Sequence, residues 1–107
     1  MAVIDITSTA QFDEILAKNA CVLVDFYATW CGPCNMIAPE IHRLSEQHGS
    51  VAFVKVNVDT QAELARRYSI SAMPTFMAFK QGARHEEAIM GANKAAIVRL
   101  VSSMSPA

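Results

Sequence analysis

The residues from Cys21 to Tyr27 form an apolar run that only one acid, Asp25, interrupts. A continuous run of this length is typical of a strand covered on both faces, as in a parallel sheet with helices on either side. A strand with one face in water would alternate apolar and polar residues instead. The run therefore predicts a central strand in an α/β domain, with a carboxyl group inside it.

Strand and helix patterns alternate along the rest of the chain. Strands are predicted at residues 3–7, 21–27, 51–58, 75–79 and 86–90. Helices are predicted from Ser8 or Thr9 to just before Asn19, from the turn at 30–33 to about 48–49, over 64–68, and after Asn93. This order implies a mixed sheet between helices. The length of 107 residues leaves room for one domain, which we expect to span residues 1–107.

Local signals define the second helix and the last two strands more closely. Pro39 lies inside the helical pattern, where we expect a kink and not a break. Gly49 suits a C-terminal cap. The connection 80–83 contains Gly82, which can adopt a positive φ, so the last two strands are expected to form an antiparallel hairpin. The apolar face of the second helix is expected to contain Met36, Ile37, Ile41 and Leu44.

Composition excludes several classes of protein. Apolar residues make up 52% of the chain and the net charge is −1, so it is neither disordered nor suited to a phosphate backbone or an anionic membrane. No apolar run approaches the roughly 18 residues of a membrane span. The start of the chain, from Met1, lacks the pattern of a secretory signal. Three cysteines are a sparse, odd set, so we expect a reducing compartment, the cytoplasm.

The segment Cys31-Gly32-Pro33-Cys34 contains the residues that can do chemistry. An offset of three residues at a helix start places two thiols on one face, close enough for a disulfide. Unpaired N–H groups and the helix dipole favour an anion there, so we expect a lowered pKa for Cys31, the nucleophile. Gly32 lets a substrate backbone approach, and Pro33 needs no N–H at this position. Cys34 is expected to be buried and to resolve a mixed disulfide.

Two other interpretations of the cysteines fit the sequence less well. Zinc needs four ligands, usually in two close pairs, but only one pair is present, and His42 and His48 follow at unsuitable spacings. Two inert buried thiols would leave the surrounding Trp30 unexplained. The third cysteine, Cys21, stands four residues before Asp25, about 13 Å at strand rise, which is too far to join the catalytic pair. A buried apolar role is expected for it, with a regulatory or dimer-forming thiol as the alternative.

Several motifs follow one another along the chain: residues 24–34 (Val-Asp-Phe-Tyr-Ala-Thr-Trp-Cys-Gly-Pro-Cys), 53–59, Met73-Pro74-Thr75-Phe76, Lys80-Gln81-Gly82 and Gly91-Ala92. In this order and spacing they resemble the thioredoxin family. The resemblance implies a thioredoxin fold, with a central mixed five-stranded sheet flanked by helices on both faces. It also implies a monomeric protein-disulfide reductase with no metal or bound cofactor, which thioredoxin reductase recharges at the expense of NADPH.

Asp25 and Lys55 are the candidate supporting residues of the chemistry. Burial is expected to raise the pKa of Asp25 toward neutrality. The resemblance makes Asp25 a proton acceptor for Cys34, whereas a structural buried acid is the alternative. Lys55 alternates with valines, which indicates a solvent-facing side chain. The resemblance makes it the neighbour that partly offsets the charge of Asp25.

The resemblance also implies a flat apolar surface that binds substrates. Pro74 would be cis and face the cysteines, and the backbone of Met73 would pair with an extended substrate segment. The methionines could instead fill the core. The residues of this surface would be Trp30, Met73, Met90, Gly91 and Ala92.

Asp59 has two possible roles. The sequence pattern favours Asp59 or Thr60 as the cap of the helix at 64–68. The resemblance favours a hydrogen bond from the indole of Trp30 to Asp59.

Two positions depart from the commonest family pattern. Asn35 stands where many members have Lys or Arg, and Tyr27 stands where bacterial members often have Trp. Both affect the expected choice of partners. Two further functions stay open: a disulfide oxidase or isomerase, against which Pro33 in place of His argues, and a binding or chaperone module without turnover.

Overall fold

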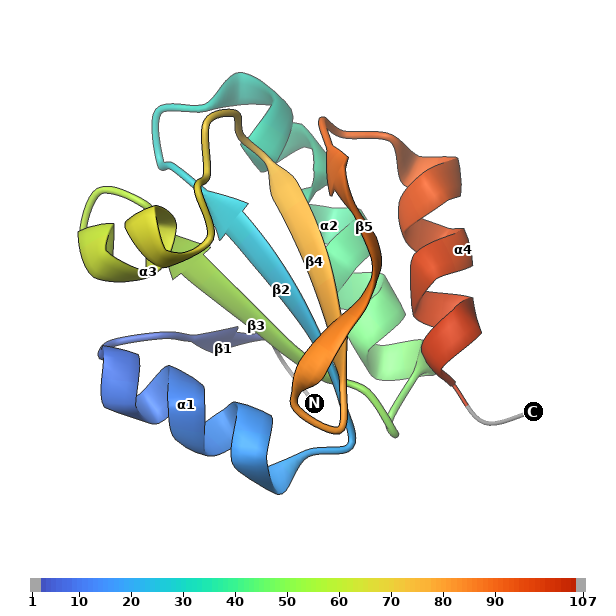
Figure 1. The fold of residues 1–107 in the computed structure, drawn as a ribbon. Coiled ribbons are helices and arrows are strands. Elements are labelled where there is room, and N and C mark those ends of the chain that lie inside the picture. Colours follow the sequence, from blue (N-terminus) through green and yellow to red (C-terminus); the bar gives the residue numbers. More distant parts are fainter. Residues whose placement is uncertain (1–2, 106–107) are drawn as a thin grey trace.

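The computed structural model describes residues 3–105 and has five strands in one mixed sheet, in the order β1-β3-β2-β4-β5 (Figure 1). The strands β1, β2 and β3 are parallel, and β4 and β5 run antiparallel to their neighbours. This confirms the predicted central strand and the hairpin. The bounds are Ile4–Asp5 for β1, Cys21–Tyr27 for β2, Ala52–Asn57 for β3, Thr75–Lys80 for β4 and Ala83–Met90 for β5. Met1 and Ala2, part of the segment on which the expectation about a secretory signal rests, lie outside the described residues.

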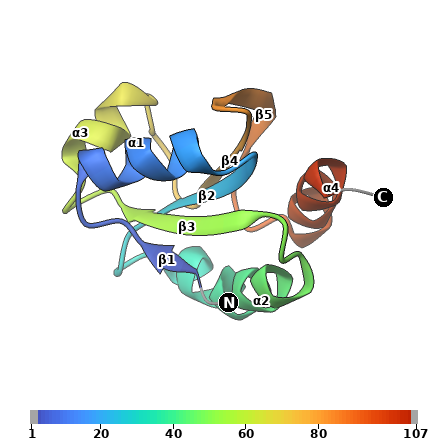
Figure 2. The ribbon, with the colours of Figure 1, turned by 90° about the horizontal axis from the view of Figure 1, so that it is seen from below.

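Among the described residues, four helices cover the two faces of the sheet, as can be followed in Figure 2. Helices α1 (Thr9–Lys18) and α3 (Ala62–Arg67) lie on one face, and α2 (Gly32–Gln47) and α4 (Lys94–Met104) lie on the other. Alternate residues of β2 point into two separate cores: Leu23 packs toward α2 and α4, and Val24 toward α1 and α3. Burial on both faces is why β2 is a nearly continuous apolar run.

Helices α1 and α4 begin at the predicted caps. The hydroxyl of Ser8 accepts a hydrogen bond from the N–H of Gln11 at 3.1 Å. The side chain of Asn93 accepts one from Ala96 N–H at 3.1 Å. Both satisfy a backbone donor that has no partner within its helix.

Helix α2 differs from the sequence prediction at two residues. It continues through Pro39 as one helix, as predicted. Its C-cap is His48, whose N–H donates to the carbonyl of Leu44 at 3.0 Å, so the helix ends where it was predicted to end. Gly49 follows the C-cap but does not have the positive φ of a capping glycine, so that part of the prediction is wrong. Met36 is 73% exposed, so its predicted place in the core is also wrong.

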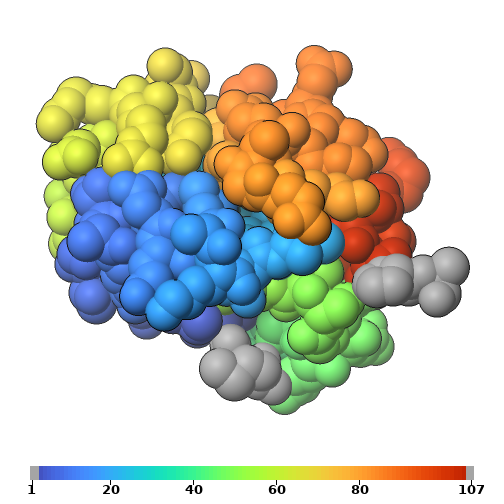
Figure 3. All heavy atoms as spheres, turned by 60° about the horizontal axis from the view of Figure 1, so that its bottom comes forward, coloured from blue at the N-terminus to red at the C-terminus, as the bar shows by residue number. Residues whose placement is uncertain are grey.

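The β4–β5 turn is shorter than predicted, and the strands are longer. Only Gln81 and Gly82 lie between them, with φ values of 52° and 80°. Two successive positive φ values match the twist of a two-residue hairpin. The turn lies beside the end of α1, where Gln81 N–H donates to the carbonyl of Ala20 at 2.8 Å (Figure 3). Within residues 3–105, no helix has the length and apolar character needed to cross a membrane.

Candidate active site

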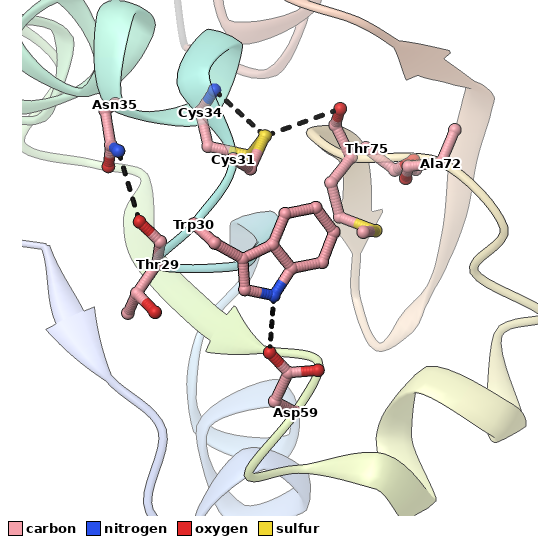
Figure 4. The surroundings of a disulfide bond; sticks show 9 residues. Thr29, Trp30, Cys31, Cys34, Asn35, Asp59, Ala72 and Thr75 are labelled. Carbon is pink, nitrogen blue, oxygen red and sulfur yellow. Dashed lines mark hydrogen bonds between the residues drawn. A yellow bond between two sulfur atoms is a disulfide. The ribbon is translucent and has the colours of Figure 1, made fainter.

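Cys31 and Cys34 form a disulfide at the start of α2, with their Cα atoms 5.3 Å apart (Figure 4). Cys31 is the N-cap of the helix, and its Sγ accepts a hydrogen bond from the N–H of Cys34 at 3.2 Å. Pro33 lies in the first turn of the helix, where a backbone N–H would have no partner within the helix, so the proline costs no hydrogen bond. A charge on Cys31 Sγ would meet this N–H and the positive end of the helix dipole, so the site favours a thiolate at Cys31.

Burial does not distinguish the two cysteines. Cys31 is 6% exposed and Cys34 is 4% exposed, and with Ala28 they form a small buried cluster against which Met73 packs. Their difference lies in position along the helix. Cys31 caps it, whereas Cys34 lies one turn in.

The loop before β4 faces the disulfide. The peptide bond between Met73 and Pro74 is cis, as the resemblance implied. The carbonyl oxygen of Met73 lies 3.7 Å from the Sγ of Cys31. Pro74 is buried, and its carbonyl accepts a hydrogen bond from Gly91 N–H at 2.8 Å. Gly91 has a φ of 94°, a conformation that residues with a Cβ rarely adopt.

The residues predicted to bind substrates lie in different environments around the disulfide. Trp30 is 69% exposed and Met90 is 67% exposed, so Met90 does not fill the core. Met73 is half-buried against the cysteine cluster, and Ala92 packs partly against the core between the sheet and α2 and α4.

The indole N–H of Trp30 donates to Oδ2 of Asp59 at 2.9 Å (Figure 4). Helix α3 begins after Gln61, and no side chain caps it. The predicted capping of this helix by Asp59 or Thr60 is therefore wrong. The hydrogen bond between Trp30 and Asp59, which the resemblance implied, is confirmed. The Asp59 carboxylate thus joins two loops, and the two bonded residues are 29 positions apart in the sequence.

Asp25 is buried in the middle of the sheet, with 6% of its surface exposed. Burial raises its pKa from 3.8 to about 7, and the opposing effect of Lys55 is smaller. Its Oδ1 has no hydrogen-bond partner among residues 3–105. Asp25 contributes to a surface pocket of about 500 Å³ that Asn35, Pro39, His42 and Lys55 also line. A pocket with these polar groups has room for water, which can carry a proton between Asp25 and the solvent.

Lys55 pairs in register with Asp25 on the neighbouring parallel strand, but its ammonium contacts a different acid. Nζ lies 3.7 Å from Oδ1 of Asp5 and 5.4 Å from the centre of the Tyr27 ring. Its side chain is 38% exposed, in agreement with the predicted solvent-facing position. Asp5 was missed in the sequence because only the register between β1 and β3 brings it to Lys55.

The other positions singled out in the sequence have structural partners. Asn35 places no charge near the cysteines, and its amide donates to the carbonyl of Thr29 at 3.2 Å. Cys21 is free and buried, as predicted, and its thiol donates to the carbonyl of Met104 at 3.4 Å. No group of three or more His, Cys, Asp or Glu side chains within residues 3–105 could hold a metal ion.

A disulfide at a helix N-terminus, faced by a cis-proline loop on a mixed α/β sheet, defines a thiol–disulfide oxidoreductase. The thioredoxin family model matches residues 3–103. The chain belongs to the thioredoxin family.

Three curated relatives give the range of proteins that contain a similar sequence. Thioredoxin-1 of Saccharomyces cerevisiae is 44% identical over 90% of this chain and 92% of its own length. A peptide-N(4)-(N-acetyl-beta-glucosaminyl)asparagine amidase of Caenorhabditis briggsae is 43% identical over 94% of this chain, which spans only 17% of that protein. A bifunctional thioredoxin reductase/thioredoxin of Mycobacterium leprae is 42% identical over 96% of this chain and 23% of its own length.

Solved structures have the same fold. The thioredoxin of Plasmodium falciparum has a TM-score of 0.92 and 39% identity, over 96% of this chain and all of that chain. A chain from a study of thiol resolution in a yeast mitochondrial 1-Cys peroxiredoxin via glutathione/thioredoxin systems has a TM-score of 0.89 and 34% identity, covering 94% of both chains.

Proposed function

We propose that this thiol–disulfide oxidoreductase works as a reductase of protein disulfides, with Cys31 as nucleophile and Cys34 as resolving thiol. The observation that carries the assignment is the contact at the helix start, where the N–H of Cys34 donates to Cys31 Sγ at 3.2 Å. This donor and the helix dipole stabilise a thiolate at Cys31 more than at Cys34, which lies further along the helix.

The reaction consists of two exchanges. In the dithiol form, the Cys31 thiolate attacks a substrate disulfide, a bond forms between Cys31 and one substrate sulfur, and the other substrate sulfur leaves as a thiolate. Cys34 then loses its proton and attacks Cys31 Sγ, which forms the Cys31–Cys34 disulfide and releases the second substrate sulfur. Two electrons pass from the Cys31–Cys34 pair to the substrate.

Asp25 is proposed to accept the proton of Cys34, through water in the adjoining pocket. A general base works best when its pKa lies near the working pH, and burial raises the pKa of Asp25 to about 7. Lys55 is proposed to limit this rise through its positive charge on the neighbouring strand.

Substrate binding is assigned to the exposed apolar side chains and the backbone around the disulfide. An extended substrate segment would pair with the backbone of Met73, whose carbonyl lies 3.7 Å from Cys31 Sγ. Trp30 and Met90 supply exposed apolar area on either side, and Gly32, Pro33, Pro74, Gly91 and Ala92 supply the shape of the surface.

The partners are proposed to be disulfide-containing proteins and an NADPH-dependent thioredoxin reductase, with the chain acting as a monomer in the reducing cytoplasm. The relative from Mycobacterium leprae, in which a thioredoxin reductase and a thioredoxin are one protein, supports the reductase. The similarity to the chain from the peroxiredoxin study supports disulfide proteins as substrates.

A coupled assay tests this function. The oxidised chain is mixed with thioredoxin reductase, NADPH and a disulfide protein, and the consumption of NADPH is followed. We expect turnover with the native chain and none with the Cys31→Ser variant. Absence of turnover with the native chain would contradict the proposed recharging.

A further inference from the structure

A row of charged side chains crosses three strands beside the active site. Lys55 on β3 is the register partner of Asp5 on β1 and of Asp25 on β2. Register partners lie about 5 Å apart and point to the same face of the sheet. One ammonium group is therefore shared between two acids, one on each neighbouring strand.

The ammonium lies on the side of Asp5. Its Nζ is 3.7 Å from Asp5 Oδ1. In the described part of the chain, Lys55 forms no ion pair with Asp25, for which Nζ would have to lie within 4.0 Å of a carboxylate oxygen. Tyr27 strengthens this placement because its ring lies under the ammonium at 5.4 Å and its hydroxyl donates to Asp5 Oδ1 at 3.5 Å. Asp25 Oδ1 meanwhile has no hydrogen-bond partner among residues 3–105.

We propose that Asp5 is a positioning residue for the exchange reaction: it holds the Lys55 ammonium away from Asp25 and so keeps Asp25 a strong proton acceptor. The link to the reaction rests on the proposed function, because it requires that Asp25 take the proton of Cys34. The effect of Asp5 on Asp25 through Lys55 rests on the sheet register and stands apart from that role.

A direct effect of Asp5 on Asp25 is expected to be small. The two acids are separated by two strand spacings, about 10 Å, and the pKa of Asp25 is set by its burial and by the charge of Lys55. Tyr27, two residues further along β2, also interacts with Asp25, but it is uncharged because burial raises the pKa of its phenol. The remaining groups near Asp25 come from α2. His42 lines the same pocket but lies 3.5 Å from Glu46, Asn35 has no charge, and Cys34 is in the disulfide. Lys55 is therefore the cation through which Asp5 acts.

The direct test is a carbon-13 NMR titration of the Asp25 carboxyl in the oxidised full chain at physiological salt. In Asp5→Asn, the ammonium loses its anionic partner and turns to Asp25, so we expect the Asp25 midpoint to move to lower pH by about half a pH unit. In Asp5→Glu, a carboxylate still reaches Lys55, and we expect the native midpoint. Lys55→Gln is expected to move the midpoint to higher pH.

The double variant separates the shared lysine from a direct field. If Asp5 acts through Lys55, adding Asp5→Asn to Lys55→Gln leaves the midpoint of Lys55→Gln unchanged. An Asp25 midpoint that Asp5→Asn alone does not move would overturn the proposal, and so would an equal shift in both backgrounds.

A kinetic readout keeps this inference distinct from the proposed function. The pH profile of substrate release from the mixed disulfide should shift to lower pH in Asp5→Asn, in parallel with the NMR midpoint. A shift of the NMR midpoint without a shift of the profile would support the effect of Asp5 on Asp25 and overturn the role of Asp25 as proton acceptor.

Discussion

The indole N–H of Trp30 and the Oδ2 of Asp59 form a 2.9 Å hydrogen bond that joins the loop before α2 to the loop after β3. The Trp30 side chain stays 69% exposed, so this bond, and not burial, fixes the ring beside the disulfide. An exposed aromatic ring with a fixed orientation offers a partner a large apolar surface at low entropic cost.

Replacing Asp59 by Ala is therefore expected to loosen the ring and slow the reduction of protein disulfides. Because Trp30 is the one tryptophan of the chain, its fluorescence anisotropy reports the loosening directly. The free energy of unfolding is expected to fall by about 1 kcal/mol or less. Asp59→Asn keeps an acceptor oxygen and should retain the native anisotropy. An unchanged anisotropy in Asp59→Ala would show that the hydrogen bond does not position the ring.

The two cysteines are expected to behave differently when only one of them is present. With Cys34→Ser, the Cys31 thiolate still attacks but no thiol resolves the product, so a stable mixed disulfide with a substrate protein should accumulate. With Cys31→Ser, far less adduct should form. Mass spectrometry under non-reducing conditions measures both. Equal amounts of adduct from the two variants would contradict the assignment of Cys31 as nucleophile.

The buried carboxyl of Asp25 predicts an unusual dependence of stability on pH. Its pKa is raised from 3.8 to about 7 in the folded chain, so between these values the folded chain binds more protons than the unfolded chain. The free energy of unfolding therefore falls as pH rises through this window. Asp25→Asn removes the effect, and we expect it to be more stable than the native chain at pH 8, by up to about 4 kcal/mol.

Urea unfolding of the oxidised chains at pH 4 and pH 8 measures this difference. The gain from Asp25→Asn should shrink toward zero near pH 4, where the acid is protonated in the folded chain. Glu87→Gln, which removes an exposed acid, is the control and should show no comparable gain. A gain of the same size at both pH values would mean that the carboxyl does not titrate near 7.

Two exposed methionines allow a matched test of the substrate surface. Met90 precedes Gly91, whose N–H donates to the carbonyl of Pro74, and we expect Met90→Ser to lower kcat/KM for protein disulfides about fivefold or more. Met36 is similarly exposed, at 73% against 67% for Met90, but lies in α2 outside the proposed surface. Met36→Ser should leave kcat/KM unchanged. Equal losses in the two variants would contradict the assigned surface.

The sequence predicted the elements well because their signals are local. The apolar run of β2 and the Asn93 cap of α4 depend on residues within a few positions of each other, and both were confirmed. Met36 was assigned to the apolar face because it is apolar and precedes a buried residue, Ile37. The spacing of apolar residues does not determine where the buried face of a helix ends.

The site was less predictable where it depends on pairing between distant segments. Asp59 follows β3 and suits a helix cap locally, but the partner it meets is Trp30. Asp5 has no local signal at all, because the register of β1 against β3 alone brings it to Lys55. Motif resemblance identified the chemistry around the cysteines, and the three-dimensional pairing identified which charges surround it.

The proposed reductase requires that the Cys31–Cys34 pair donate electrons to protein disulfides. The most direct test is its equilibrium reduction potential, measured against a glutathione redox buffer. We expect a value near −270 mV, the value known for thioredoxin, which is low enough to keep the dithiol a reductant. A value between about −180 and −120 mV, the range of disulfide isomerases and oxidases, would contradict it.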